Sequence, residues 1–462
     1  MGADASRAMF EAMISVFEEA GMPYCILAGY DGYPDSIPSD VDFMMPAEWA
    51  PRLPALIAAA AARSGAHLVQ HIAHETTASY FALARLDGDC IAWLHPDACS
   101  DFRRGGRLWL RAEPILARRR RHPRGFWIPA AGDAFAYYLV KKLDKGGIDS
   151  QQARQLAARY AEDPAGARAA LRRLLPADDA EFVDAAASEA SWTPVAGRLS
   201  SLNAGLRRHT HGESGGDRLR QLGADIRRAA VRILHPTGLC IAFLGPDGSG
   251  KSTVVAYAGG ELARAFRAVE RRHLRPPLPF AREHEDGAPV INPHDQPPRG
   301  TVAALAKVLV FWARYVAGGL YWLAPRRVRS RLVVFDRYYH DILVDPLRYR
   351  IAPGSLAEGL ARLLARRVPQ PDLVFVLDAP PEVLRARKQE VPEEECRRQC
   401  AAYLQLAREL PNARVIDAAL PLEQVTARVL QHVLAALEAR TRARLGIDRA
   451  PEGAPGAMPW KA

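Results

Sequence analysis

Cysteine is scarce in this 462-residue chain. The six cysteines are scattered, with no CxxC pair and no histidine at zinc-ligand spacing, at Cys25, Cys90, Cys99, Cys240, Cys396 and Cys400. Cys396 and Cys400 lie four residues apart, which makes them neighbours on one face of an expected helix rather than metal ligands. The pattern argues against a zinc module or a disulfide scaffold, and it indicates reduced, mostly buried thiols, as is usual in the cytoplasm.

A secretory signal and an unbroken apolar span are also lacking. The first residues, MGADASRAMFEAM, contain no basic region followed by an apolar stretch. The longest apolar stretch, Thr301–Leu323, is interrupted by Lys307 and Arg314 and suits a buried or amphipathic helix better than a membrane span. We therefore expect a cytoplasmic protein whose contact with a membrane is at most peripheral.

Length and charge limit the number of domains and the kinds of partner that are expected. A chain of this length is too long to fold around a single hydrophobic core, so two domains are expected. The net charge of +10 indicates acidic or phosphorylated partners. It does not single out nucleic acid, because an enzyme with several phosphate-binding arginines would carry a similar charge. No nucleic-acid partner is expected.

Hydrophobic periodicity divides the chain into four segments. Residues 1–206 alternate short apolar runs with helical patterns and become helical from Ala131 onward, which predicts a small α/β domain with a helical extension. Residues 207–236 hold a polar, glycine-rich linker and a basic helix. Residues 237–446 form the second domain, and residues 447–462 are expected to be a disordered tail.

The second domain is predicted to be α/β, with a parallel sheet and helices on both of its faces. Near-continuous apolar strands separated by helices are typical of such sheets. The expected strands are Gly238–Leu244, Arg331–Phe335, Asp372–Asp378 and Ala413–Asp417. Helices are expected over Gly250–Arg267 and Pro421–Arg444, and a mobile loop over Pro276–Arg299.

The most specific motif is GPDGSGKST, from Gly245 to Thr253, which fits the P-loop pattern GxxxxGK[ST] between an expected strand and an expected helix. Its glycines allow backbone amides to surround phosphate oxygens, and the following helix adds its positive N-terminus. Lys251 would bridge the β- and γ-phosphates of ATP, and the Ser252 hydroxyl would bind Mg²⁺. The predicted ATP-binding residues are Gly245, Asp247, Gly248, Ser249, Gly250, Lys251, Ser252 and Thr253.

A second motif narrows the class. The run RLVVFDR is an apolar strand that ends in Asp336, with Arg337 directly after it. A carboxylate at the carboxyl end of a neighbouring strand can hold Mg²⁺ or accept a proton, and an adjacent arginine can bind a phosphate through two hydrogen bonds.

In combination these motifs resemble the thymidylate kinase family. The P-loop with its internal acid Asp247, the sequence DRY at Asp336–Tyr338 and the run PDLVFVLDAPPEVLRARK at Pro371–Lys388 occur in the family's order. The resemblance covers about Gly238–Leu437 and implies a P-loop NTPase sheet and an ATP- and Mg²⁺-dependent kinase. Such an enzyme could act as a homodimer.

The resemblance also implies roles for individual residues. Asp247 would contact a hydroxyl of the acceptor, Arg337 would bind the acceptor's phosphate, and Asp336 would order Mg²⁺ or act as a base. Lid cations would neutralise the transferred phosphoryl group, and these are Arg385, Arg387 and Lys388.

The acceptor side departs from true thymidylate kinases. The sequence HLRPP resembles that family's substrate-phosphate loop only faintly, and it offers Arg275 as an acceptor contact. Asp341, Asp345 and Arg348 stand where the thymine-binding residues are expected. The arrangement resembles thymidylate-kinase-like proteins encoded with bacterial surface-polysaccharide genes, so the acceptor could be a nucleoside monophosphate or a carbohydrate.

The N-terminal segment carries a different pattern. A strand ending near Gly29 is followed by Asp40-Val-Asp42, and two carboxylates two residues apart on a strand face the same side and can share a divalent metal. The pattern resembles the nucleotidyltransferase fold, which also needs a third carboxylate. Asp97 is the first candidate, although Pro96 before it cannot donate to a sheet, and Asp101 is the second.

Three functions follow from these observations. The first is a two-domain kinase that transfers the γ-phosphoryl group of ATP. The second is a metal-dependent nucleotidyltransferase in which the P-loop domain is regulatory. The third is a non-catalytic NTP-binding adaptor.

Overall fold

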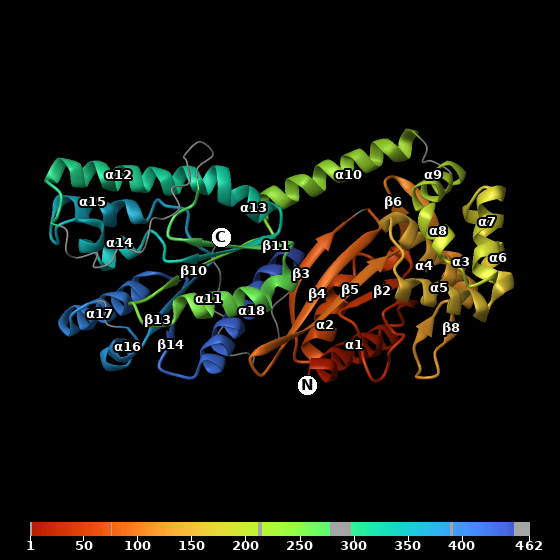
Figure 1. Cartoon of the computed structure of the whole chain (residues 1–462), viewed down its shortest axis with the longest axis horizontal. Coiled ribbons are helices and arrows are strands. Elements are labelled where there is room, and N and C mark those ends of the chain that lie inside the picture. The colour runs from red at the N-terminus through yellow and green to blue at the C-terminus, as the bar shows by residue number, and fades with distance from the viewer. Residues whose placement is uncertain (1, 75, 211–214, 278–296, 389–390, 448–462) are drawn as a thin grey trace. The chain divides into compact units, whose positions relative to one another are not determined.

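The structure is a computed structural model that describes residues 2–74, 76–210, 215–277, 297–388 and 391–447 (Figure 1). The chain divides into two compact units. Unit 1 comprises Met1–Asp87, Ala92–Ala230 and Leu437–Ala462, and unit 2 comprises Gly88–Ile91 and Val231–Ala436. The expected α/β class is confirmed, and both units are built around a sheet.

The sheet of unit 1 is mixed. Its strands among the described residues are β1 (Cys25–Ala28), β2 (Asp40–Met44), β3 (His67–Ala73), β4 (Ala78–Asp87) and β5 (Cys90–Cys99). They lie in the order β1-β2-β5-β4-β3, with β2 and β5 parallel and with the pairs β1–β2 and β3–β4 antiparallel. The sequence did not predict β3, which joins the sheet through its pairing with β4.

Helices cover both faces of this sheet. Ile26 and Phe43 belong to a buried cluster with α1 (Gly2–Glu19) and α2 (Leu53–Arg63). Leu27 and Met44 belong to another cluster with the helical extension. Because successive strand residues face opposite sides, Asp42 faces the same side as Met44, toward the helical extension.

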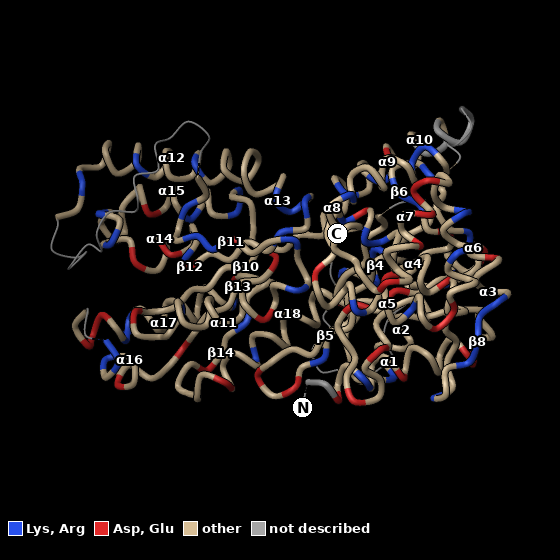
Figure 2. The backbone as a smooth tube through the Cα atoms, turned by 45° about the vertical axis from the view of Figure 1, so that its right-hand side comes forward, with Lys and Arg blue, Asp and Glu red and all other residues tan. Residues whose placement is uncertain are grey.

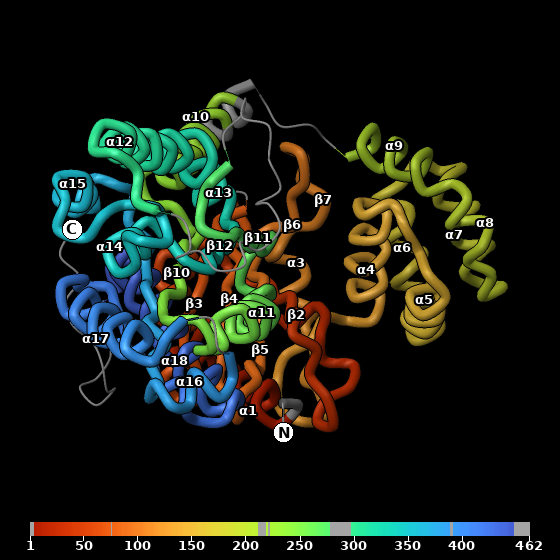
Figure 3. Tube along the Cα trace, turned by 60° about the vertical axis from the view of Figure 1, so that its left-hand side comes forward, coloured from red at the N-terminus to blue at the C-terminus, as the bar shows by residue number. Residues whose placement is uncertain are grey.

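The helical extension forms a group of its own within unit 1 (Figure 3). Its helices are α4 (Ala131–Lys145), α5 (Ser150–Glu162), α6 (Pro164–Leu174), α7 (Ala177–Ser188), α8 (Thr193–Gly197) and α9 (Leu199–His209). The expected basic helix is α10 (Gly215–Leu234), and residues 211–214 of the expected linker lie outside the described residues. The remaining elements are η1 (Ala47–Trp49), α3 (Ala112–Ala117), β6 (Asp101–Arg104), β7 (Arg107–Arg111), β8 (Arg120–Arg121) and β9 (Trp127–Ile128).

The sheet of unit 2 is parallel throughout its described strands. These are β10 (Leu239–Leu244), β11 (Ala268–His273), β12 (Arg331–Asp336), β13 (Leu373–Asp378) and β14 (Ala413–Asp417), in the order β11-β12-β10-β13-β14. The four predicted strands are confirmed. The fifth, β11, was not predicted, because its sequence AVERRH is charged and suits an edge strand.

The strand order places β10 at the centre of this sheet. From β10 the chain continues to β11 and β12 on one side and later to β13 and β14 on the other. A parallel sheet opens a crevice at the carboxyl end of such a central strand, because the connections leave it in opposite directions. The loop that begins at Gly245 follows β10 directly, so it lies at this point.

Helices fill the connections of unit 2. They are α11 (Lys251–Glu261), η2 (Leu262–Ala265), α12 (Thr301–Gly318), η3 (Gly319–Leu323), α13 (Ala324–Val328), α14 (Asp341–Val344), η4 (Leu347–Tyr349), α15 (Leu356–Ala365), α16 (Pro381–Arg387) and α17 (Glu393–Glu409). The helix predicted from Gly250 ends at Glu261 and continues as the short η2. Most of the predicted loop Pro276–Arg299 and nearly all of the tail lie outside the described residues.

The C-terminal helix α18 (Leu422–Leu445) lies within the predicted second segment, residues 237–446, but its residues are divided between the two observed units. From Leu437 onward the helix belongs to unit 1. There Thr441 Oγ1 donates to the backbone oxygen of Val69 at 3.0 Å, and an Arg444 guanidinium nitrogen donates to that of His71 at 2.6 Å. Both acceptors lie on β3, so the final turns of α18 belong to unit 1 rather than to unit 2.

One stretch of the described helices, Thr301–Val328, is long and apolar enough to cross a membrane by length and composition alone. A third of its most apolar part is buried within the protein.

Candidate functional site

Two glycines of the loop after β10 occupy positions that no other residue fits. Gly245 has φ of 144°, and a Cβ atom there would lie 2.5 Å from the backbone oxygen of Leu377. Gly248 has φ of 86°, and its Cβ would lie 2.6 Å from the backbone oxygen of Leu384. Both φ values are strained for residues with a side chain. The tight turn and the close approach of β13 and α16 therefore explain the glycine spacing.

Lys251 begins α11 and is buried inside the loop. Its Nζ donates to the backbone oxygens of Gly245 and Pro246, both at 2.8 Å. Burial, followed by the nearby Arg337 guanidinium, lowers the pKa of Lys251 to about 8. The lysine is thus held at the loop by hydrogen bonds to neutral carbonyl groups, with Asp247 Oδ1 farther away at 3.9 Å, and a phosphate in the loop would be a closer ionic partner for its ammonium group.

Ser252 and Asp336 meet between α11 and β12. The Ser252 hydroxyl donates to Asp336 Oδ2 at 2.7 Å. This contact arises because β10 and β12 are parallel neighbours in which Phe243 pairs with Asp336. The other carboxylate oxygen, Asp336 Oδ1, is buried and has no hydrogen-bond partner among the described residues.

These oxygens suit a hard cation such as Mg²⁺. In nucleotide sites Mg²⁺ commonly binds one or two protein oxygens and takes its other ligands from phosphate and water. The buried, unpaired Asp336 Oδ1 and the neighbouring Ser252 hydroxyl match this requirement. Among the described residues, no group of three or more His, Cys, Asp or Glu side chains is arranged to hold a metal ion.

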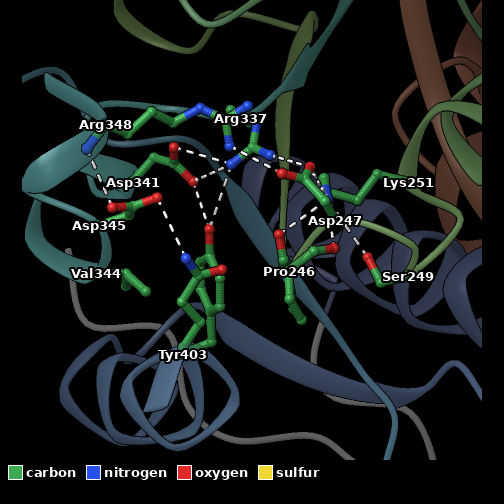
Figure 4. A network of polar contacts seen from close by, with 12 residues as sticks. Pro246, Asp247, Ser249, Lys251, Arg337, Asp341, Val344, Asp345, Arg348 and Tyr403 are labelled. Carbon is green, nitrogen blue, oxygen red and sulfur yellow. Dashed lines mark hydrogen bonds and ion pairs between the residues drawn. The ribbon is translucent and has the colours of Figure 1, made fainter. Parts of the chain in front are cut away.

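Arg337 lies at the centre of the polar network beside the loop (Figure 4). Its φ is 71°, unusual for a residue with a side chain, and its backbone N–H donates to Phe243 O at 2.9 Å. One guanidinium nitrogen donates to Asp341 Oδ1 and Oδ2 at 2.8 and 3.0 Å, and another donates to Asp247. The strained backbone therefore aims a buried guanidinium between two carboxylates.

Asp247 links the loop to a second arginine. Its Oδ2 accepts a hydrogen bond from Arg348 at 3.0 Å, while Oδ1 accepts from Arg337 (Figure 4). The Arg348 backbone N–H in turn donates to Asp345 Oδ1 at 3.1 Å. Gln399 of α17 donates to the other oxygen of Asp345 at 3.3 Å. The loop, η4 and α17 are thus connected by side-chain hydrogen bonds.

Asp341 is the fully buried anion of the network. Besides Arg337, it accepts hydrogen bonds from the hydroxyls of Tyr349 and Tyr403. Burial would raise the pKa of Asp341, but the Arg337 charge and the Tyr403 hydrogen bond outweigh it and hold the pKa below its ordinary value. The carboxylate stays ionised and anchors Arg337 from the side opposite Asp247.

Sequence reasoning missed part of this network. Asp341 and Arg348 were noted only as departures from the thymidylate kinase pattern. No helical spacing could have linked Asp341 to Arg337, because Arg337 precedes α14 and has a φ of 71°. Tyr403 offers no signal either, since it comes from α17, 66 residues after Arg337 in the chain.

The structure places the predicted lid cations next to the loop but binds them elsewhere. Their helix, α16, touches the loop where Leu384 O faces Gly248. Arg385 forms an ion pair with Glu393 at 2.8 Å, and Arg387 donates to the backbone oxygen of Ala418 at 2.8 Å. Among the described residues, neither arginine forms a hydrogen bond or an ion pair with the loop.

Arg275, the predicted acceptor contact, follows β11. Its guanidinium lies over the ring of Phe311 at 5.4 Å, and its buried Nε has no hydrogen-bond partner among the described residues. In the part of the chain that the structure describes, no hydrogen bond or ion pair joins Arg275 to the network around Arg337.

In unit 1 the structure brings Asp42 and Asp97 together. They are paired residues of the parallel strands β2 and β5. Pro96 lacks an N–H, but this does not disturb the pairing. The His95 N–H donates to the Ser39 oxygen on the β2 side, so the backbone nitrogen of Pro96 faces the other neighbouring strand, β4. Asp101 lies on β6 in a separate sheet and accepts a hydrogen bond from the backbone of Ala112.

The carboxylates of unit 1 are not alone on their face. Lys141 of α4 forms an ion pair with Asp42, and His95 Nδ1 lies 3.2 Å from Asp40 Oδ1. Burial, with the charge of Asp42 second, raises the pKa of Asp97 to about 6. Gly29 packs so tightly against β2 that a Cβ atom would lie 2.4 Å from Asp40 O. These contacts give unit 1 a compact, partly protonatable acidic cluster.

No protein-family model matches this chain, and no curated protein matches it. The residues and their geometry are therefore the basis for assigning a function.

Proposed function

We propose that unit 2 is an ATP- and Mg²⁺-dependent phosphotransferase with a P-loop NTPase fold of the thymidylate kinase type. The observation that carries the proposal is the meeting of Ser252 and Asp336 at 2.7 Å, directly beside Lys251. A phosphate-binding loop, a metal-binding hydroxyl and a strand-end carboxylate at one edge of a parallel sheet are the parts that phosphoryl transfer requires.

In this proposal the amides of Gly248 and Gly250 and the ammonium group of Lys251 hold the β- and γ-phosphates of ATP. Mg²⁺ at this site would supply positive charge to neutralise the phosphates. Ser252 and Asp336 hold the metal. Lys251, which now donates to carbonyl oxygens and lies 3.9 Å from Asp247 Oδ1, exchanges the carbonyl oxygens for phosphate oxygens.

The acceptor is proposed to bind beside Asp247, Arg337 and Arg348. Arg337 is fixed by Asp341, so its remaining hydrogen-bonding capacity points toward Asp247. Arg348 reaches the same carboxylate from η4. An acceptor hydroxyl bound to Asp247 and an acceptor phosphate bound to the arginines fit a nucleoside monophosphate or a phosphorylated carbohydrate.

The test is product analysis by mass spectrometry after incubation with Mg-ATP and a panel of nucleoside monophosphates, sugars and lipid-linked glycans. We expect Lys251→Ala to abolish product formation without unfolding the protein. Lys307→Ala is a matched control, since Lys307 is also a partly buried lysine of unit 2 that donates to a backbone oxygen. Transfer that survives in Lys251→Ala would exclude this function.

A metal-dependent nucleotidyltransferase in unit 1 is a second candidate, and the pairing of Asp42 with Asp97 favours it. In that case Asp40→Asn combined with Asp42→Asn removes all activity, and Lys251→Ala changes nothing. The same product analysis separates the two functions, because nucleotidyl transfer releases pyrophosphate whereas phosphoryl transfer from ATP releases ADP.

A further inference from the structure

The helical stretch formed by α12, η3 and α13 has one face built into the core of unit 2. Val308, Phe311, Tyr315 and Trp322 are buried in the cluster that includes β12 and α15. α12 lies along the outside of the unit beside α15 (Figure 1). Because one face of the stretch belongs to this core, the stretch cannot leave the protein to span a bilayer without unfolding unit 2.

The opposite face of the stretch is exposed and lacks charge. Val302, Val310 and Tyr321 are 81%, 70% and 71% exposed, and Leu309 and Leu320 are also open to solvent. Every described residue classed as exposed between Val302 and Tyr321 is an aliphatic residue or a tyrosine. Such a continuous apolar strip on a surface helix usually marks an interaction site.

The two charged residues between Val302 and Tyr321 turn back onto the protein and do not belong to the exposed face. Lys307 Nζ donates to the backbone oxygen of Tyr349 at 2.6 Å, and Arg314 Nε donates to that of Pro276 at 3.4 Å. Lys307 and Arg314, which interrupt the apolar run in the sequence, therefore leave the exposed face apolar. This face is more apolar than the sequence of the helix suggests.

Basic residues border the strip, and acidic residues are missing from it. No aspartate or glutamate occurs between Asp295 and Asp336. Arg299 precedes α12 and Arg329 follows α13, and both are exposed without an ion pair to a described carboxylate. In Figure 2 the tube along α12 and α13 is tan and blue, without the red that marks acidic residues. The neighbouring α15 exposes Leu356 and Leu363, and its end carries the exposed residues Arg366 and Arg367.

We propose that this strip, Val302 to Tyr321 with its flanking arginines, binds in the plane of an anionic phospholipid surface. An amphipathic helix with apolar residues on one face and arginines at its border sinks into the boundary between headgroups and acyl chains. Tyr321 lies toward the arginine-rich end, and tyrosine is favoured at the headgroup level. A second copy of the chain is a poorer partner, because two such faces would oppose arginines without carboxylates between them.

The test uses the full chain and vesicles of phosphatidylcholine, with or without phosphatidylglycerol, in a flotation assay. We expect binding to the anionic vesicles only, and weaker binding at high salt. Val310→Asp lowers the partition coefficient by about tenfold or more, because it replaces an inserted aliphatic side chain with a charge. Leu422→Asp is the matched control, since Leu422 is an exposed leucine of unit 2 in the first turn of α18, where aspartate is tolerated.

A second variant tests the proposal independently of any misfolding that Val310→Asp could cause. Arg329→Glu with Arg366→Glu leaves the apolar strip intact and should remove the preference for anionic lipid, while circular dichroism checks that both variants are folded. Leu222→Asp on α10 tests the other exposed amphipathic helix, and its binding should equal that of the unchanged protein. Absence of binding, equal binding by Val310→Asp and Leu422→Asp, or a lipid-free dimer that Val310→Asp dissociates would each overturn the proposal.

Discussion

The hydroxyl of Ser252 and the carboxylate of Asp336 are hydrogen-bonded at 2.7 Å although 84 residues separate them in the chain. The two residues come from a helix start and a strand end, and the parallel pairing of β10 with β12 places them side by side. The second oxygen of Asp336 is buried and unpaired among the described residues. A pair held in this way can accept a cation without rearranging the sheet.

The first prediction concerns this pair. Asp336→Asn should weaken the binding of Mg-ATP but not of metal-free ATP, and it should lower kcat by about 100-fold or more, the usual effect of removing one electrostatic contact from a transition state. Calorimetric titration with and without Mg²⁺ measures the first effect, and steady-state kinetics measures the second. Asp417→Asn, at the end of β14 in the same sheet, should change neither.

The second prediction concerns the buried charge of Asp341. Its replacement by alanine removes a fully buried carboxylate and leaves the Arg337 guanidinium with less compensation. We expect a loss of about 3 to 5 kcal/mol in the free energy of unfolding of unit 2, the usual cost of breaking a buried ion pair. Amide hydrogen exchange in β10 and β12, measured as a function of urea, reports it.

Arg397→Ala is the control for Asp341→Ala. Arg397 forms an exposed ion pair with Glu393 in the same unit, and such pairs contribute roughly 1 kcal/mol or less. Equal losses in the two variants would mean that the network around Arg337 has no special role in stability.

The third prediction is a pH dependence from Asp97. Its pKa is raised to about 6 by burial and then by Asp42, so between about pH 4 and pH 6 the folded state binds more protons than the unfolded state. Stability from this group is complete below its unfolded pKa and is lost as the pH rises through the folded pKa. Asp97→Asn should therefore stabilise unit 1 by roughly 2 to 3 kcal/mol near pH 7, and the gain should vanish near pH 4.

The effect of Asp97→Asn is measured by urea denaturation over this pH range, with amide exchange in β2 as the readout. Lys141→Met is the companion variant, because the Lys141 charge opposes the rise in the pKa of Asp97. In that background the gain should still begin near pH 4, but it should keep growing to a higher pH and become larger. A stability difference that is the same at every pH would refute the interpretation.

The fourth prediction concerns the backbone of the loop. Gly248→Ala forces a Cβ atom to within 2.6 Å of Leu384 O at a φ of 86°, so the loop must shift away from α16. We expect nucleotide affinity to fall by at least about tenfold, together with about 1 to 3 kcal/mol of local strain. Gly260→Ala, in α11 with open space around it, should retain affinity and slightly stabilise the helix.

The strength of the sequence signal depended on how local each feature is. The loop from Gly245 to Thr253 could be predicted because the strand, the glycine spacing and the helix start are adjacent in the chain. Asp336 could be predicted for the same reason, because it is the polar residue at the end of an apolar strand. The edge strand β11 was missed, because its charged residues carry no apolar pattern.

By itself, the sequence determined the α/β class, the strands that flank the loop and the residue types available to bind phosphate and metal. Only the tertiary structure decided which side chains meet. Parallel register joined Ser252 to Asp336 and Asp42 to Asp97, and packing of α17 brought Tyr403 to Asp341. Backbone patterns are local and leave a trace in spacing, whereas contacts between distant elements depend on strand order and helix packing, which no short stretch of residues encodes.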